Sequence, residues 1–173
     1  GKRWTIWCGS MFEYTIRPVT PEDLDGVTAV EAACFPPAEA ASRERFARRI
    51  AQFPDRFFVA CSAGRIIGLV NGCRSDRPHI DDAMFESGAH VPDGLYQMIF
   101  GLAVLPEFQH RGVAAALLRQ MIASSHTLGL AGIALTCKAE KIGYYARFGF
   151  VAQGVSASVH GGAVWYDMAL ENP

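Results

Sequence analysis

The stretch that fixes the fold reads Leu102-Ala103-Val104-Leu105-Pro106-Glu107-Phe108-Gln109-His110-Arg111-Gly112-Val113-Ala114. An apolar run typical of a buried strand ends before Pro106, and a helical pattern begins at Gly112. The first N–H groups of a helix have no acceptor inside the helix, and the helix dipole makes that end positive. Because residues 112 and 114–116 are small, a ligand can approach the backbone closely, and we interpret the turn as a pyrophosphate site. It is neither a Walker A loop, since the Gly-Lys-Ser/Thr ending is absent, nor a dinucleotide fingerprint, since the turn holds one glycine.

Periodic patterns on either side of this stretch predict an α/β fold. Apolar alternation or continuous apolar runs predict strands at 14–19, 56–61, 65–71, 95–104, 132–137, 150–158 and 163–169. Helical spacing and capping residues predict helices at 21–33, 43–52, 112–126 and 140–148. The strand–helix–strand run from 95 to 137 predicts a parallel strand pair, and the first and last hairpins predict antiparallel pairs. We expect one domain, with a single mixed sheet and helices on both of its faces.

Composition excludes several classes of protein. The chain has 173 residues, half of them apolar, with 16 basic and 17 acidic residues. No basic excess points to nucleic acid, and no run of 18 apolar residues points to a membrane-spanning helix. The five cysteines form no C-x-x-C pair, so we expect no metal site and a reducing, cytoplasmic compartment. We expect residues 1–10 to be either an N-terminal extension or residues added for expression, and residues 11–173 to be the domain. We expect the protein to be a monomer or homodimer.

Two motifs together resemble a known family. The pattern Gln109-x-x-Gly112-x-Ala114 resembles the acetyl-CoA-binding motif of the GNAT superfamily of N-acetyltransferases, Gln/Arg-x-x-Gly-x-Gly/Ala. Further along, Tyr145, Gly149 and Phe150 match the superfamily's Tyr-x-x-x-Gly-Phe signature. The resemblance covers residues 14–170 and implies the GNAT fold.

Within the superfamily the chain is similar to the arylalkylamine (serotonin) N-acetyltransferases. The similarity lies in Thr20-Pro21-Glu22-Asp23, in Glu31-x-x-Cys34-Phe35-Pro36, in Phe108 before the motif, and in Cys137 eight residues before the tyrosine. The resemblance implies direct transfer of an acetyl group from acetyl-CoA to a primary amine, with no metal. A small aralkyl- or alkylamine is the expected acceptor.

The resemblance also assigns roles to residues. It implies that the backbone N–H groups of Gln109, His110, Arg111, Gly112, Val113, Ala114 and Ala115 hold the pyrophosphate. The edge formed by Leu102, Ala103 and Val104 would pair with the pantetheine arm. An N–H near Leu102, made available by a bulge, would polarise the thioester carbonyl. Tyr145 would contact the coenzyme and act as the general acid that protonates the leaving thiolate.

The proton acceptor for the amine cannot be carried over. The arylalkylamine enzymes use two histidines on the strand before the motif, and here those positions are Met98 and Phe100. Glu31, Glu86 and His90 are the candidate replacements. The resemblance gives no role to Cys137 as a nucleophile, because the superfamily generally uses direct attack.

The acceptor pocket is expected to be lined by Phe35, Pro36 and Phe100. Protein N-termini, polyamines and aminoglycosides are alternative acceptors. Another alternative is a sensor that binds acyl-CoA without catalysis, against which Tyr145 argues, since binding alone needs no proton donor.

Overall fold

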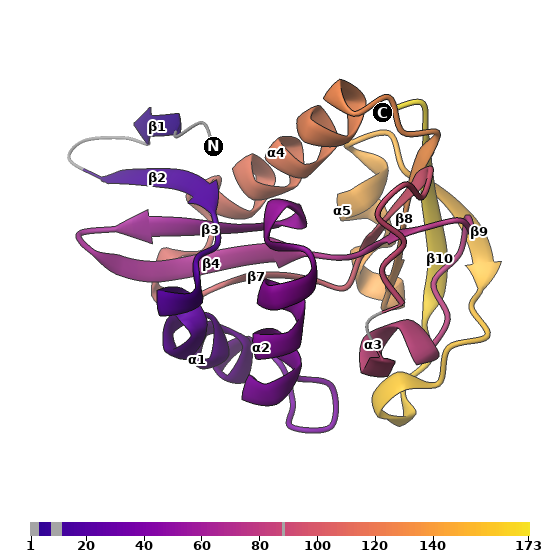
Figure 1. Ribbon diagram of the computed structural model, residues 1–173, viewed down its shortest axis with the longest axis horizontal. Coiled ribbons are helices and arrows are strands. Elements are labelled where there is room, and N and C mark those ends of the chain that lie inside the picture. The colour runs from indigo at the N-terminus through magenta and orange to yellow at the C-terminus, as the bar shows by residue number, and fades with distance from the viewer. Residues whose placement is uncertain (1–3, 8–11, 88) are drawn as a thin grey trace. The chain divides into compact units, whose positions relative to one another are not determined.

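The computed structural model describes residues 4–7, 12–87 and 89–173 and separates into two compact units. Unit 1 comprises Gly1–Asn71 and Gly101–Met121, and unit 2 comprises Gly72–Phe100 and Ile122–Pro173. Each unit holds one five-stranded sheet (Figure 1). The longest helix, α4 (Val113–Thr127), begins in unit 1 and ends in unit 2.

The sheet of unit 1 is antiparallel throughout, in the order β1-β2-β3-β4-β7. Its strands are β1 (Trp4–Trp7), β2 (Glu13–Pro18), β3 (Phe57–Ser62), β4 (Arg65–Asn71) and β7 (Gly101–Val104). The predicted hairpin β3–β4 is confirmed. Strand β1 lies in the segment expected to be an extension, and the rest of that segment, residues 1–3 and 8–10, lies outside the described residues.

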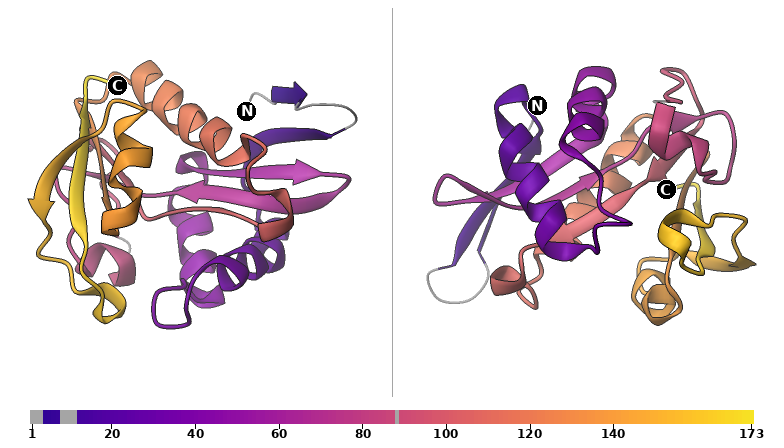
Figure 2. Two further views of the ribbon diagram at one scale, coloured as in Figure 1. Left: turned by 180° about the vertical axis from the view of Figure 1, so that it is seen from behind. Right: turned by 90° about the horizontal axis from the view of Figure 1, so that it is seen from below.

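Helices cover both faces of this sheet (Figure 2). On one face lie α1 (Leu24–Cys34) and α2 (Arg43–Gln52), and the first turns of α4 lie on the other. Short 3-10 turns stand at η1 (Pro21–Asp23), η2 (Pro54–Arg56) and η3 (Pro106–Phe108). Helix α1 approaches β4 closely because Gly26 has no side chain: a Cβ there would lie 2.7 Å from Cγ1 of Ile66. Leu117 and Leu118, predicted on the apolar face of α4, are fully buried.

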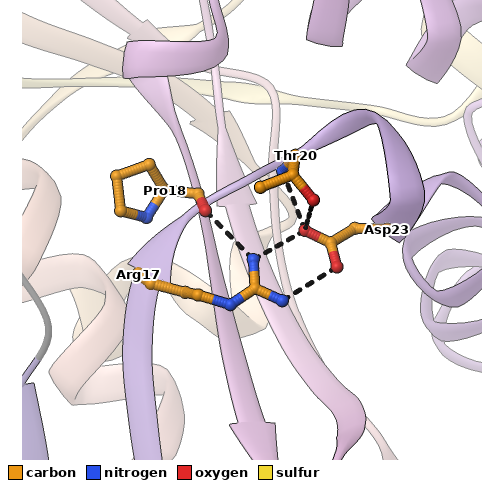
Figure 3. Close-up of polar contacts among 4 residues, drawn as sticks. All are labelled: Arg17, Pro18, Thr20 and Asp23. Atoms are coloured by element: carbon orange, nitrogen blue, oxygen red, sulfur yellow. Dashed lines mark hydrogen bonds and ion pairs between the residues drawn. The ribbon is translucent and has the colours of Figure 1, made fainter. Parts of the chain in front are cut away.

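A partly buried ion pair links the end of β2 to the start of α1 (Figure 3). Arg17 donates from Nη1 and Nη2 to the two carboxylate oxygens of Asp23, at 2.7 and 2.9 Å. The same carboxylate accepts the N–H of Thr20 at 2.8 Å, as a capping residue does for the chain entering a helix. Burial alone would raise the pKa of Asp23, but the hydrogen bonds from Arg17 and Thr20 outweigh it, and that pKa is lowered.

The sheet of unit 2 has the order β5-β6-β8-β10-β9. Its strands are β5 (Arg74–Ser75), β6 (Tyr96–Ile99), β8 (Gly132–Cys137), β9 (Val151–Val155) and β10 (Tyr166–Glu171). Strands β6 and β8 run parallel, which confirms the predicted strand–helix–strand connection, and the final hairpin β9–β10 is antiparallel as expected. The helices are α3 (Ala83–Ser87), α5 (Ile142–Ala146), η4 (Ala139–Lys141) and η5 (His160–Gly162).

The predicted single mixed sheet is wrong, because the strands form two five-stranded sheets. Three predictions about individual elements were also wrong. The run 95–104 is not one strand in one sheet, because it is interrupted at Phe100, and β6 and β7 belong to different sheets. The stretch 74–94, where the sequence shows no period and no element was predicted, contains β5 and α3, which are too short to show a period. The helix predicted at 140–148 consists of η4 followed by α5. No helix among the described residues is long and apolar enough to cross a membrane.

Candidate active site

Strand β7 is the last strand of its sheet and pairs only with β4 in the described part of the chain. The N–H of Leu105 donates to the carbonyl of Ile67 at 2.8 Å, which makes these two a hydrogen-bonded pair of the antiparallel ladder. Such pairs alternate along a ladder. The backbone groups of Leu102 and Val104 therefore point away from β4, toward the open edge. This edge can pair with an extended ligand as an added strand.

The turn after β7 brings unpaired N–H groups to the start of α4. His110 and Gly112 both have left-handed backbones, with φ of 62° and 82°. Ala116 is the first residue here whose N–H donates to the preceding turn, to Gly112 O at 3.0 Å. The N–H groups of Val113, Ala114 and Ala115 have no helical acceptor among the described residues. Together with the positive end of a fifteen-residue helix they can bind a pyrophosphate.

The backbone N–H of Gln109, which we expected to bind the pyrophosphate, has a partner within the protein. Its N–H is directed at the carbonyl of Pro106, at 3.3 Å, rather than toward a ligand. Its side-chain Nε2 donates to the carbonyl of Val104 at 2.9 Å. The side chain thus ties the turn to the end of β7, and the turn's shape depends on it.

Aromatic rings support the same turn. The ring of Phe108 stacks on that of Phe12 with centroids 5.7 Å apart. The guanidinium of Arg111 lies 5.0 Å from the centroid of Phe12, which adds a cation–π contact. Arg65 pairs with Glu107 at 3.0 Å. These contacts hold η3 and the residues after it in place.

Glu31 is buried on α1, with 5% of its surface exposed. Its Oε2 accepts the N–H of Ala41 at 2.9 Å, which holds the connection between α1 and α2. Its Oε1 lies 3.6 Å from the position that a Cβ on Gly101 would occupy. Phe35, half-buried, and Pro36, exposed, begin the same α1–α2 connection. Of the three predicted proton acceptors, Glu31 is therefore the one beside β7 in unit 1.

The other candidate acceptors lie in unit 2. Glu86 is exposed on α3. His90 is half-buried, and its Nδ1 accepts the N–H of Arg74 at 3.1 Å, so this nitrogen is already used. Phe100 is half-buried with its ring 5.1 Å from that of Phe85, and Met98 is fully buried. Unit 2 thus presents an aromatic side chain at one of the two positions where the arylalkylamine enzymes carry histidine.

Tyr145 stands half-buried on α5 in a group of aromatic rings. The ring of Tyr144 lies 5.3 Å from its own, and that of Phe150 lies 6.0 Å away. Desolvation by its surroundings raises the pKa of Tyr145, with smaller contributions from Cys137 and Tyr144. The side chain is a neutral phenol that can donate a proton.

Cys137 is 4% exposed, and burial raises its pKa to about 11. It is therefore a neutral thiol near pH 7, which agrees with the expectation that it is not a nucleophile.

Asn71 was not predicted as a residue of the site. It ends the apolar run of β4, pairs across the ladder with Gly101, and is fully buried. Arg49, itself 6% exposed, donates from Nη1 to Oδ1 of Asn71 at 3.0 Å. The indication in the sequence is a polar residue that directly follows the apolar run 66–70. In the described part of the chain, no three His, Cys, Asp or Glu side chains gather as a metal site.

Comparison with known proteins places these features in a family. The sequence profile of the acetyltransferase (GNAT) family matches residues 24–150. No curated relative is detected by sequence, and the similarity to serotonin N-acetyltransferases is not supported by any comparison.

Solved structures share the fold at low sequence identity. A GNAT-like decarboxylase, GphF, in complex with isobutyryl-CoA superposes with a TM-score of 0.80 at 21% identity, covering 91% of this chain and 99% of that one. The loading domain of CurA from Lyngbya majuscula gives 0.80 at 18% identity, covering 92% and 98%. The ribosomal-protein-S18-alanine N-acetyltransferase from Escherichia coli gives 0.67 at 22% identity, covering 91% and 93%.

Proposed function

Because the chain belongs to the acetyltransferase (GNAT) family, we propose that this acetyl-CoA-dependent enzyme acetylates the primary amine of a small aralkyl- or alkylamine. The observation that carries the proposal is the start of α4. There Val113, Ala114 and Ala115 offer N–H groups without helical acceptors, directly after a strand whose edge is open. Those two features suit the diphosphate and the extended arm of a coenzyme A thioester.

The residues of unit 1 would hold the coenzyme as follows. The N–H groups from His110 to Ala115 bind the pyrophosphate oxygens. Leu102 pairs with the amides of the pantetheine arm, and Val104 contributes its N–H, since its carbonyl is bound by Gln109 and Cys34. The N–H of Leu102 is also the donor placed to polarise the thioester carbonyl, a contact that typically contributes on the order of 10² to 10³ in rate.

Two side chains would handle protons. Glu31 accepts the proton that the amine must lose before it can attack, because an alkylamine is largely protonated at pH 7. Tyr145 donates a proton to the departing thiolate, for which its raised pKa keeps it in the phenol form. Phe35 and Pro36, at the start of the α1–α2 connection, give an aromatic or apolar acceptor a matching wall. With these roles the expected partners are acetyl-CoA and one amine.

The proposal is tested by supplying the protein with acetyl-CoA and a panel of acceptors, and by measuring the free thiol of the coenzyme A that each acceptor releases. Phenethylamine, tryptamine and an alkylamine should release coenzyme A in proportion to acetylated product. An N-terminal alanine peptide, a polyamine and an aminoglycoside are the competing acceptors. Turnover confined to one of those would replace the proposed acceptor class. Tight binding of acetyl-CoA with no turnover on any amine would instead favour the alternative of a sensor that binds acyl-CoA without catalysis.

Decarboxylation of an acyl-CoA with a second carboxylate is a second candidate. It is favoured by Met98 and Phe100, since that reaction needs no base for an amine. One similar structure carries the name of a decarboxylase. An N–H at Leu102 would stabilise the enolate in the same way as an oxyanion. Incubation with malonyl-CoA, followed by mass spectrometry for acetyl-CoA in the absence of any amine, separates this candidate from the first.

A further inference from the structure

Strand β9 is the last strand of the sheet in unit 2, and within the described residues it pairs only with β10 (Figure 1). All of its residues, Val151–Val155, are exposed. The N–H of Ser156 donates to the carbonyl of Trp165 at 2.8 Å, which makes these two a hydrogen-bonded pair of the ladder. Because such pairs alternate, the backbone groups of Val155 point away from β10, toward the open edge. Another strand can pair with this edge.

Exposed apolar side chains gather in the same segment. Six large apolar side chains are exposed among the described residues, and four of them lie in β9 or in its connection to β10. These four are Val151, Val155, Val159 and Val164, with 63 to 71% of their surface exposed. Single exposed apolar side chains are common on protein surfaces, whereas several close together mark an interaction surface.

The segment also lacks charge. No Asp, Glu, Lys or Arg occurs between Arg147 and Asp167, although these residue types make up 19% of the chain. Edge strands that stay unpaired are usually protected by a charged side chain or a proline, and β9 has neither. A bulge near Gly154, where the register with β10 shifts, adds twist to the strand. A second copy carries the same bulge, so two such edges have matching twist.

These properties favour a second copy of this chain as the occupant. Against another uncharged surface the segment buries no unpaired charge, and with a formal net charge of −1 two copies repel each other little. A standard interface buries about 800 Å² per partner, and the whole chain exposes 8680 Å². Residues 151–165 make up nearly a tenth of the chain and most are exposed, so they can supply most of that area. Antiparallel strand pairing also has the two-fold symmetry of most dimers.

We propose that two copies of the protein pair through β9 in antiparallel orientation, so that their unit 2 sheets join into one continuous sheet. When the two strands overlap completely, Val151 of one copy lies beside Val155 of the other. The two copies of Gln153 then lie next to each other at the two-fold axis. This surface goes beyond the proposed function, and no acceptor or coenzyme is needed to test it.

Sedimentation of the full chain over a wide range of concentration tests the pairing. The mass should rise from 18.8 kDa to twice that value as the concentration increases. Gln153→Lys places two like charges beside each other at the axis and should weaken the dimer by on the order of 10²-fold in Kd, and Gln153→Glu should do the same. An equimolar mixture of the two variants should dimerise again, because the charges at the axis are then opposite.

Leu128→Lys is the matched control, because Leu128 is an exposed apolar residue outside the segment, at 46%. It should dimerise as wild type does, and all variants should keep the wild-type melting temperature. A chain that is monomeric at every concentration overturns the proposal and leaves the edge to an unrelated strand. It is also overturned if the Gln153 variants dimerise normally, if their mixture stays monomeric, or if Leu128→Lys dissociates as well.

Amide hydrogen exchange shows whether strand pairing holds the dimer. The N–H of Val155 should exchange on the order of 10²-fold more slowly in dimeric wild type than in monomeric Gln153→Lys. Equal exchange rates in a dimeric wild type would place the interface on another surface and contradict the pairing. If the dimer forms as described and no amine is acetylated, the proposed function fails while this interface stands.

Discussion

The side-chain amide of Gln109 donates to the carbonyl oxygen of Val104, five residues earlier, at 2.9 Å. The thiol of Cys34 reaches the same oxygen from the end of α1, at 3.2 Å. That carbonyl faces the open edge of β7, so two side chains satisfy a group that the sheet leaves unpaired. The contact also sets the path of the turn that presents the N–H groups of α4.

Gln109→Ala should weaken binding of coenzyme A while leaving the fold intact. Loss of one hydrogen bond of this kind costs about 1 kcal/mol, or roughly fivefold in Kd. Titration calorimetry with coenzyme A measures the effect. Gln153→Ala, on the exposed strand β9, is the control and should bind as wild type does. Equal affinity of Gln109→Ala and wild type would show that the turn keeps its shape without the amide.

Gly112→Ala should reduce both stability and coenzyme affinity. Its φ of 82° is unfavourable for any residue with a Cβ, at about 1–2 kcal/mol, although a Cβ there would meet no atom within 4 Å. Gly129 at the end of α4 has a φ of 70° and equally open surroundings. Gly129→Ala should therefore lower the melting temperature similarly but leave coenzyme binding unchanged. If both variants bind coenzyme A equally well, the turn at Gly112 is not its site.

Tyr145→Phe should slow turnover at saturating acceptor, because the phenyl ring has no proton for the thiolate. We expect a loss of about 10²-fold in kcat with little change in KM for the amine. An acid acts while it is protonated, and the pKa of Tyr145 is raised above its ordinary value of about 10. Wild-type kcat should therefore show no fall on the alkaline side up to pH 10. A decline centred near pH 9 would assign the proton donor to another group.

Cys137 should be dispensable and slow to react. With a pKa of about 11 its thiolate is scarce at pH 7.5, and alkylation by iodoacetamide should be slower than that of a free thiol by on the order of 10²-fold. Cys137→Ser should keep acetyl transfer within a few-fold of wild type. A complete loss of transfer, with an acetylated enzyme detectable by mass spectrometry in wild type, would restore the covalent route.

Asp23→Asn should destabilise the protein in a pH-dependent way. The folded-state pKa of Asp23 is lowered, so its stabilisation is present above the unfolded value near 4 and is lost as pH falls through the folded value. Urea unfolding at pH 7 should show a loss of about 2 kcal/mol, and the difference from wild type should shrink in acid. Asp25, with 85% of its side chain exposed in its pair with Arg43, is the control: Asp25→Asn should change little.

The sequence predicted the elements with clear periods. Helix α4 was recognised because Leu117, Leu118 and Met121 repeat at helical spacing, and all three are fully buried. The turn at Gly112 was recognised because a small residue, a preceding strand and a following helix occur together. Strand β5 and helix α3 were missed because two and five residues are too few to establish a period.

The surroundings of Gly101 could not be predicted. Glu31 and Asn71 are forty residues apart and meet only because α1 packs on the face of β4 where Asn71 lies. We expected Gln109 to act through its backbone N–H. The hydrogen bond from its side chain to the carbonyl of Val104 was not predicted, because a contact across a turn leaves no pattern in the sequence. The break at Phe100 was hidden for a similar reason: residues 95–104 are apolar on both sides of it.

The ladder between β4 and β7 fixes which residues of β7 face β4 and which face the open edge of the sheet. Leu102 and Val104 face the open edge because Leu105 bonds to Ile67; a slip of one residue would exchange them for Gly101 and Ala103. The connection from Asn71 to Tyr96 lies outside this ladder, so a change in its length would not by itself shift the register. One codon gained or lost between Phe100 and Leu105 would turn the donor at Leu102 inward, and such insertions should be absent from working descendants of this sequence.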